Sequence, residues 1–225
     1  MFHVKHKALA IALLLGSIFN ARGQGSFLMT DKPFIHRQFE DSVLRGNLER
    51  NSAYLKLNGD EQEFFYWVNV LRKDPSAFGR HYVLPFMTQF PELYGQDSKS
   101  LEEDLHNTQP LEPFQPDATL NRTAHFHAMD LAEHQKPISH FSTKGESFPV
   151  RMEMAGIRTC AAENLYDGKN EPLKALIMLL IDFGIKGHGH RKALLRSDFR
   201  EMGVAIIPRP EQESFAVVVQ HFSCQ

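Results

Sequence analysis

The sequence predicts an α+β domain in which helices pack on a small antiparallel sheet. Residues 117–134 repeat apolar side chains every three or four positions, which is the period of an amphipathic helix. Residues 173–183 are rich in Leu, Ile and Met, which indicates a buried helix. Residues 202–207 and 215–222 are rich in Val, Ile and Phe, which indicates two strands. Helices outnumber strands and flank this pair, so the α+β class is favoured.

The composition is that of an ordinary globular protein without a strong net charge. The chain has 225 residues, 42% hydrophobic and 23% charged, enough for one domain with extensions. The 27 acidic and 25 basic residues nearly balance, and no basic segment is interleaved with aromatic side chains. We therefore expect no nucleic-acid partner. The 12 histidines direct attention to histidine clusters.

The first 23 residues have the pattern of a secretory signal peptide. Two lysines precede an apolar run at 8–19, and Ala21 and Gly23 supply small side chains before the expected cleavage site. The alternative is an uncleaved membrane anchor, but this run is shorter than the roughly 20 residues that span a bilayer. We therefore expect a secreted or periplasmic protein with no transmembrane segment once residues 1–23 are removed.

The segment after the signal peptide leads into the main domain. Residues 24–57 are polar and mixed, and we expect an extended or partly helical arm before a domain at 58–225. The domain begins with a helix for which Asp60 is the expected N-cap and Glu63 the capping-box partner. This helix ends before Pro75, because the residue before a proline is disfavoured in helical conformation.

The middle of the chain alternates between loops and short helices. Residues 84–116 contain five prolines, which indicates a loop-rich insertion with one short helix near 99–106. A second short helix at 148–155 ends at Gly156. Residues 160–165 form a short apolar segment.

The last third of the chain supplies the buried helix and the hairpin. Pro172 suits the first turn of the helix at 173–183. A glycine-rich loop then leads to a short helix at 190–196. The polar residues 208–213 suit the turn between the two final strands.

The helix at 117–134 carries histidine in its apolar stripe. The stripe contains Leu120, Ala124, His127, Ala128, Leu131 and His134. His127 lies near its centre, and an imidazole among apolar neighbours needs a hydrogen-bond partner or a metal. A backbone carbonyl is the simplest partner, since most buried polar groups are paired in this way. His125 points away from the stripe and is expected on the surface.

Other polar residues that suit a site are scattered along the chain. They are His140, Glu163, His188 and His190, together with His127. Imidazole and carboxylate groups suit zinc or a similar divalent ion, and they also support acid–base chemistry. Each has a simpler interpretation: Glu163 as a surface carboxylate or cap, His188 as a solvent-exposed residue, and His190 as an ordinary helix residue. No metalloprotease, nucleophile-elbow, phosphate-loop or dinucleotide motif is present.

The chain has two cysteines, Cys160 and Cys224. In an exported protein a disulfide between them is plausible. Two free buried thiols are the alternative, and the sequence does not decide between the two.

Several ordered fragments resemble one family. They are Leu120-x-x-x-Ala124-x-x-His127-Ala128-x-Asp130-Leu131-Ala132, Ser139-His140, Arg151 with Gly156, Ala162-Glu163-Asn164-Leu165, Gly189-His190-Arg191-x-x-Leu194-Leu195 and Gly203-Val204-Ala205. Asn69-x-x-Arg72 resembles the family's first-helix signature. This order and spacing, over about residues 60–222, resemble the CAP superfamily of cysteine-rich secretory proteins, antigen 5 and pathogenesis-related proteins, and most of all its cysteine-poor bacterial branch.

The resemblance implies a three-layer α-β-α sandwich with a central antiparallel sheet. It also implies a cleft lined by histidine and glutamate that binds a divalent metal in some members. Carried over, the cleft residues are His127, His140, Glu163 and His190, and the candidate metal ligands are His127, Glu163 and His190.

The chain departs from the eukaryotic family pattern at two places. Val68 stands where the first helix usually carries a histidine. In the family, a tryptophan-containing motif carries the second glutamate of the cleft. The segment Leu180-Ile181-Asp182-Phe183 stands in its place here, so Asp182 is the candidate replacement for that carboxylate.

Three functions follow from this interpretation. The first is a secreted protein whose cleft binds a divalent metal, such as zinc, or a small polar ligand. The second is a metal-dependent hydrolase of a peptide, ester or glycan, in which a metal-bound water near Glu163 is activated. The third is a structural or protein-interaction module for an extracellular ligand or protein.

Overall fold

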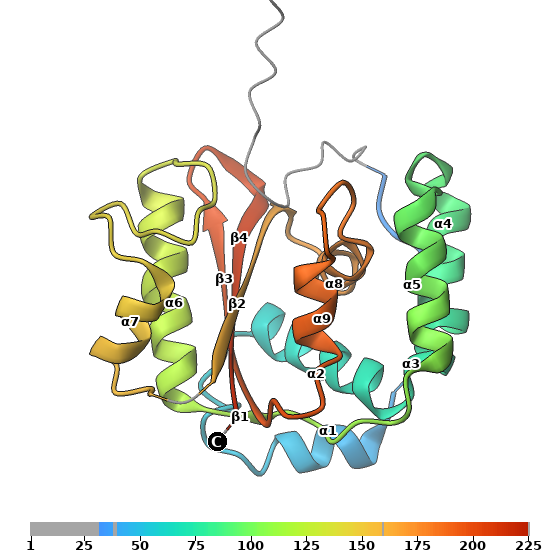
Figure 1. Ribbon diagram of the computed structural model, residues 1–225, viewed down its shortest axis with the longest axis horizontal. Coiled ribbons are helices and arrows are strands. Elements are labelled where there is room, and N and C mark those ends of the chain that lie inside the picture. Colours follow the sequence, from blue (N-terminus) through green and yellow to red (C-terminus); the bar gives the residue numbers. More distant parts are fainter. Residues whose placement is uncertain (1–31, 38–39, 159, 225) are drawn as a thin grey trace, which may run out of the picture.

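A four-stranded sheet forms the centre of the fold. The computed structural model describes residues 32–37, 40–158 and 160–224. β3 (Glu201–Arg209) and β4 (Gln212–Ser223) form an antiparallel hairpin, and β2 (Ala161–Lys169) pairs antiparallel with β4. The short β1 (Gln115–Pro116) pairs parallel with β3, so the strand order is β1-β3-β4-β2. Helices cover both faces (Figure 1), which confirms the predicted α-β-α sandwich, with β1 making the sheet mixed.

The sequence indicated β2 only as a short apolar segment. In the structure four successive residues, Glu163 to Tyr166, are buried. Both faces of β2 are covered, because Leu165 packs in the core beneath α6 while Tyr166 packs in the core on the other face. A strand buried on both faces lacks the alternation of apolar and polar residues that identifies a half-exposed strand.

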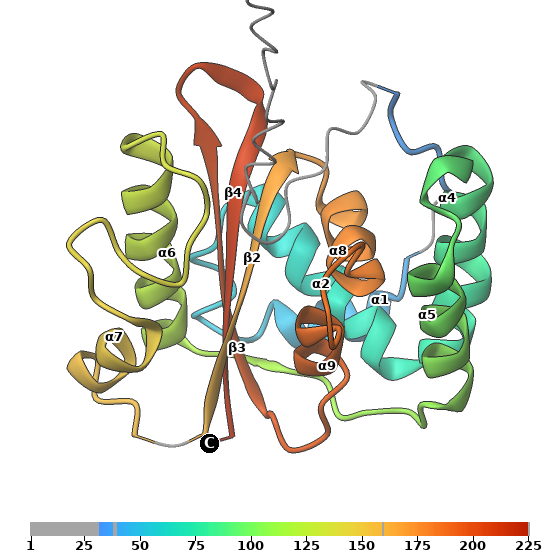
Figure 2. The same cartoon turned by 45° about the horizontal axis from the view of Figure 1, so that its top comes forward.

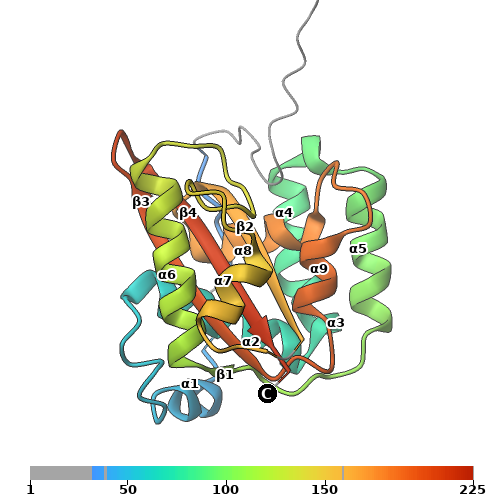
Figure 3. The same ribbon diagram turned by 60° about the vertical axis from the view of Figure 1, so that its left-hand side comes forward.

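One face of the sheet is covered by α6 (Ala118–Glu133) and α7 (Phe148–Met154), as Figures 2 and 3 show. Asp117 caps α6 by accepting a hydrogen bond from the Leu120 backbone at 2.7 Å. The predicted apolar stripe of α6 is buried, including His127. His134 is the exception: it is the C-cap, it is exposed, and its ring bonds the Asp130 carbonyl at 2.8 Å, because the helix ends before the stripe reaches it.

α6 lies unusually close to the sheet at Gly203. A Cβ atom on Gly203 would lie 2.1 Å from the Leu120 carbonyl carbon and 2.3 Å from the Asn121 nitrogen. Both are backbone atoms that cannot swing aside. Only glycine therefore permits this approach, which sets how near α6 comes to β3.

The opposite face carries α2 (Gly59–Lys73), α8 (Pro172–Ile181) and α9 (Gly189–Leu194). α8 is buried from Leu173 to Ile181, as its apolar sequence predicted. The N-cap of α2 is Asn58, with Glu61 closing the capping box. The predicted N-cap Asp60 and capping-box partner Glu63 are therefore each wrong by two residues. Asn58 is an equally good N-cap, and the helix starts two residues earlier than predicted.

Two residues of the first-helix signature tie α2 to distant segments. Asn69 exchanges hydrogen bonds with the Phe114 backbone at 3.1 and 2.8 Å. Arg72 is fully buried and donates to the backbone carbonyls of Glu112 and Leu194 at 2.8 and 2.9 Å. These residues serve the architecture.

The proline-rich segment 84–116 is more helical than the sequence indicated. It contains α4 (Leu84–Gln89), a short 3₁₀ turn at Pro91–Leu93 and α5 (Gln96–Asn107), which includes the predicted helix near 99–106. With α3 (Pro75–Phe78) and a π-helical turn (Gly79–Val83), they form an outer helical layer (Figure 1). Prolines in the first turn of α4 and of the 3₁₀ turn begin these elements instead of breaking them.

The N-terminal segment packs onto the domain where it is described. α1 (Ser42–Leu48) buries Leu44 and Leu48, and Phe34 also joins the main core. The proposed signal peptide, residues 1–23, lies outside the described residues. Among the helices that are described, none is both long and apolar enough to cross a membrane.

A disulfide joins the start of β2 to the end of β4. Cys160 and Cys224 are bonded, with their Cα atoms 5.7 Å apart. Of the two alternatives for these cysteines, the structure has the disulfide. It closes the end of the β2–β4 pair next to the polar cluster described below.

Candidate functional site

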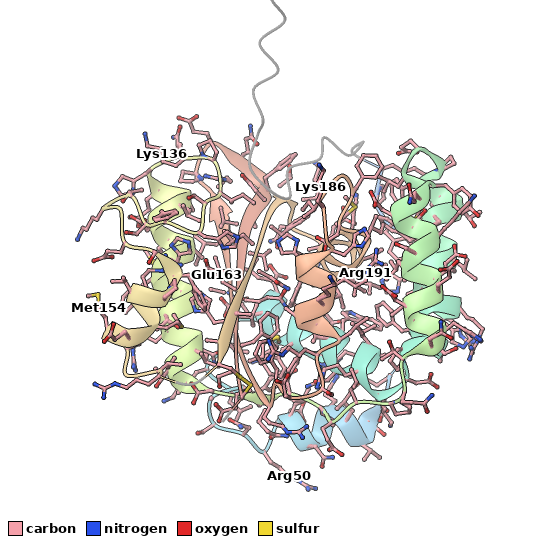
Figure 4. The ribbon with its side chains drawn as sticks, in the orientation of Figure 1. Arg50, Lys136, Met154, Glu163, Lys186 and Arg191 are labelled. Atoms are coloured by element: carbon pink, nitrogen blue, oxygen red, sulfur yellow. A yellow bond between two sulfur atoms is a disulfide. The ribbon has the colours of Figure 1, made fainter. Side chains whose placement is uncertain are left out.

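A buried carboxylate, Glu163, is the centre of a polar cluster between β2 and the α6–α7 layer (Figure 4). Its side chain is 1% exposed. Its residue lies directly opposite His221 in the β2–β4 register, so both side chains face α6. Glu163 Oε1 accepts a hydrogen bond from His140 Nδ1 at 2.8 Å, and Oε2 accepts one from His221 Nε2 at 2.8 Å.

Arg151 neutralises this buried charge. It projects from α7 and forms an ion pair with Glu163 Oε2. The same guanidinium donates to the carbonyls of His140 at 2.8 Å and Glu146 at 3.1 Å. Arg151 therefore links the cluster to the loop that carries His140.

His127 reaches the same cluster from α6. Its side chain is fully buried, and Nε2 lies 2.9 Å from the Ser139 carbonyl and 3.8 Å from Glu163 Oε2. A carbonyl can only accept, so Nε2 carries the hydrogen and Nδ1 has the lone pair. Burial lowers the pKa of His127 to about 4, which keeps the ring neutral at pH 7. His127 Nε2 therefore fits the simpler of the two predictions, a core histidine bonded to a backbone carbonyl.

His221 is a member of the cluster that the sequence reasoning missed. Its ring is fully buried, with Nδ1 2.8 Å from the Thr123 hydroxyl and Nε2 bonded to Glu163. Burial lowers the pKa of His221, so this ring is also neutral. The signal was available: Val217, Val219 and His221 alternate along one face of a predicted strand.

The hydrogen bonds to Glu163 keep its charge inside the protein. Burial alone would raise the pKa of Glu163, but hydrogen bonds from His140 and His221 and the charge of Arg151 outweigh that effect. The pKa of this carboxyl therefore lies well below its usual range. The cluster is one buried ion pair, Glu163 with Arg151, beside the neutral imidazoles of His127 and His221.

His190 lies elsewhere, which corrects the expectation that four polar residues share one pocket. It belongs to α9, which is on the opposite face of the sheet (Figure 1). Successive residues of a strand point to opposite faces, and Asn164, next to Glu163, bonds the His190 carbonyl at 3.2 Å. The structure thus brings His127, His140 and Glu163 together, and His190 approaches β2 from the opposite face of the sheet.

His190 has its own carboxylate partner, Asp182. His190 Nδ1 lies 2.5 Å from Asp182 Oδ1, and both side chains are buried. Asp182 adopts left-handed backbone conformation, with φ 54°, at the end of α8. A non-glycine residue in this region costs free energy, and such residues concentrate at functional sites. Asp182, the candidate replacement for the family's second carboxylate, is thus the hydrogen-bond partner of His190.

His188 is half-buried and bonds Asp97 at 3.0 Å instead of being solvent-exposed. His125 is on the surface, as expected.

The ligand set His127, Glu163 and His190 does not gather around one point. In the described part of the chain, the one group of three potential ligands close enough for an ion is Cys160, Asp198 and Cys224, and its sulfurs are already joined in the disulfide. Both oxygens of Glu163 accept hydrogen bonds, and the Arg151 cation lies against them. Glu163 is therefore arranged to orient imidazoles.

Two carboxylate–imidazole pairs result, one on each side of β2. Glu163 holds His140 through Nδ1, and Asp182 holds His190 through Nδ1. In the sheet formed by the described residues, β2 is an edge strand. A carboxylate that fixes one ring nitrogen is the usual way in which a metal-ligating histidine is oriented.

Comparisons with known proteins agree with this architecture. Residues 65–224 match the family model described as "CAP: Cysteine-rich secretory protein family". None of the curated proteins matches the chain.

Solved structures that are similar to the chain include bacterial surface and extracellular proteins. An extracellular protein containing an SCP domain from Bacillus anthracis is 19% identical, with a TM-score of 0.47, over 75% of this chain and 41% of that protein. An outer surface protein from Borrelia burgdorferi is 19% identical, with a TM-score of 0.43, over 61% of this chain and 90% of that one. The structure of NaASP2 with Zn²⁺ is 12% identical, with a TM-score of 0.38, over 75% of this chain and 81% of that one.

The match to the Bacillus protein spans less than half of that protein's length. The family model, in contrast, covers most of the present chain, including β2, α9 and the final hairpin. The chain therefore belongs to the CAP, or cysteine-rich secretory protein, family.

Proposed function

We propose that this CAP protein acts outside the cytoplasm as a binding protein whose ligand site lies along the outer edge of β2. The site takes a divalent metal such as zinc on the imidazoles of His140 and His190. The observation that carries the proposal is the pair of carboxylate–imidazole hydrogen bonds, 2.8 Å for Glu163–His140 and 2.5 Å for Asp182–His190.

The donor chemistry suits zinc. Neutral imidazole nitrogens are preferred zinc ligands, and a carboxylate on the other nitrogen fixes the ring and raises its basicity. Glu163 and Asp182 serve as these orienting groups, while Arg151 and His221 hold Glu163 in place. Bound zinc would supply a Lewis acid that attracts an anionic or polar ligand.

The extracellular location rests on the signal-peptide pattern of residues 1–23 and on the disulfide, since disulfides persist in oxidising compartments. Two similar structures are named as extracellular or outer surface proteins, which is consistent with this location.

Zinc titration by calorimetry on the purified, untagged chain tests the metal site. We expect saturable binding that weakens by about tenfold or more in His140→Gln and in His190→Gln. His134→Gln is the matched control, because His134 is exposed at the end of α6 and should leave affinity unchanged.

Equal affinity in wild type and both site variants would contradict the proposal. Chelator-sensitive turnover of a peptide, ester or glycan would favour the metal-dependent hydrolase instead. A Glu163→Gln variant that loses stability but keeps its zinc affinity would favour the structural role.

A further inference from the structure

A groove lies on the far side of the polar cluster, between α6, α7 and the loop that joins them. Its volume is about 550 Å³, within the range of small-molecule sites. Phe126 of α6 and Met154 of α7 line it, and both side chains are largely exposed, at 65% and 72%. Figure 4 shows Met154 at the outer margin of this layer, away from the sheet.

Two residues that line this groove each have a buried polar atom that lacks a partner among the described residues. His127 and Arg151 both line the groove. Within the described residues, His127 Nδ1 and Arg151 Nε have no hydrogen-bond partner. The first is an acceptor, because Nε2 carries the hydrogen that goes to Ser139, and the second is a donor. Buried polar atoms without partners are rare, and each calls for an explanation.

Two cationic side chains line the groove. Arg122 and Lys144 line it and form no hydrogen bond or ion pair with any described residue. Two carboxylates also line the groove, and their oxygens accept hydrogen bonds from neighbours: Asp130 from Thr143, and Glu146 from the Ser142 hydroxyl. The groove therefore offers an anionic ligand two cations, Arg122 and Lys144, that have no partner among the described residues.

We propose that this groove binds a small aromatic anion that carries an N–H or O–H group. The aromatic body packs against Phe126 and the Met154 thioether, contacts that favour a flat π-system. The anionic group lies at the guanidinium of Arg122 and the ammonium of Lys144. The N–H or O–H donates to His127 Nδ1. The site is distinct from the zinc site on the edge of β2 and needs no metal.

Two fluorescent probes differ in one feature and test the proposal. Anilinonaphthalene sulfonate has an aromatic body, an N–H and an anion, and N-phenylnaphthylamine is the same body without the anion. With a chelator present, we expect one anilinonaphthalene sulfonate per chain, bound about fivefold or more tightly than the uncharged probe. Equal affinities for the two probes would overturn the role of the cations.

Surface variants localise the binding without disturbing the buried cluster. Phe126→Ser should weaken binding of both probes about fivefold or more, and Arg122→Glu should remove the preference for the anionic probe. Leu55→Ser and Arg50→Glu are matched controls, since both side chains are exposed and neither lines the groove. Circular-dichroism melting establishes that each variant is folded.

The location in the groove would be contradicted if Phe126→Ser bound both probes as wild type does, or if Arg50→Glu and Arg122→Glu had the same effect. The zinc site is unaltered in all four variants, so the two proposals fail independently.

Discussion

Replacing Glu163 by glutamine removes the buried negative charge while keeping the size of the side chain. Arg151, whose side chain is 11% exposed, would then be a buried cation without its counter-ion. Breaking a buried ion pair by removing one partner typically costs about 3–5 kcal/mol. His140 adds little to this cost, because its side chain is 40% exposed and water screens the contact.

The expected loss of unfolding free energy for Glu163→Gln is therefore about 3–5 kcal/mol. Urea unfolding followed by circular dichroism measures it as a lower midpoint at unchanged slope. In a protein of this size, the same loss lowers Tm by roughly 10 °C. Glu153→Gln is the matched control, because Glu153 is an exposed carboxylate on α7. Its unfolding free energy should stay within about 0.5 kcal/mol of wild type.

A double-mutant cycle identifies the cause. Arg151→Met combined with Glu163→Gln should cost clearly less than the sum of the two single variants, by about 1 kcal/mol or more, because no charge is left unpaired. A loss below about 1 kcal/mol for Glu163→Gln, or strict additivity in the cycle, would refute the reasoning that a buried ion pair organises this cluster.

Three further predictions concern stability. Burial lowers the pKa of His127 to about 4, so between pH 6.5 and 4 the unfolded chain binds a proton at this residue and the folded chain does not. Urea unfolding should therefore show the unfolding free energy falling from pH 6.5 to 4, with about 3 kcal/mol of the loss due to His127. The loss should be smaller in His127→Gln. Gly203→Ala should prevent folding or lower Tm strongly by forcing α6 off the sheet, whereas Gly46→Ala, with open space around it in α1, should be neutral or slightly stabilising. Changing both Cys160 and Cys224 to serine should cost about 4 kcal/mol, since their separation of 64 residues closes a long loop, and Tm measured with and without reductant checks this.

The sequence predicted best what depends on local periodicity. The start of α6 was predicted within one residue, because its apolar stripe is encoded locally. The same periodicity placed His127 inside the core. α8 was equally clear, since an uninterrupted apolar run after Pro172 has few alternatives.

Errors arose where tertiary packing decides the outcome. β2 is covered on both faces, so its pattern did not distinguish a strand from a short apolar segment. The prolines of the 84–116 segment begin helices whose apolar faces are buried by distant parts of the chain.

Which residues share the site depends on which face of the sheet each β2 side chain points to. Local sequence patterns do not decide this until β2 is known to be a strand. Once β2 is a strand, Glu163 and Asn164 must face opposite sides, and His190 contacts the side of Asn164. The register with β4 then brings His221 opposite Glu163. If the pairing between β2 and β4 had been known, the predicted cluster would have contained His221 instead of His190.

The most direct test of the proposed metal site is an anomalous-scattering crystal structure of the protein with zinc. The account predicts its strongest zinc peak at the imidazoles of His140 and His190, with Glu163 and Asp182 still bonded to their Nδ1 atoms. A zinc ion bound directly to Glu163 in place of Arg151, or zinc only at exposed histidines such as His134, would contradict it.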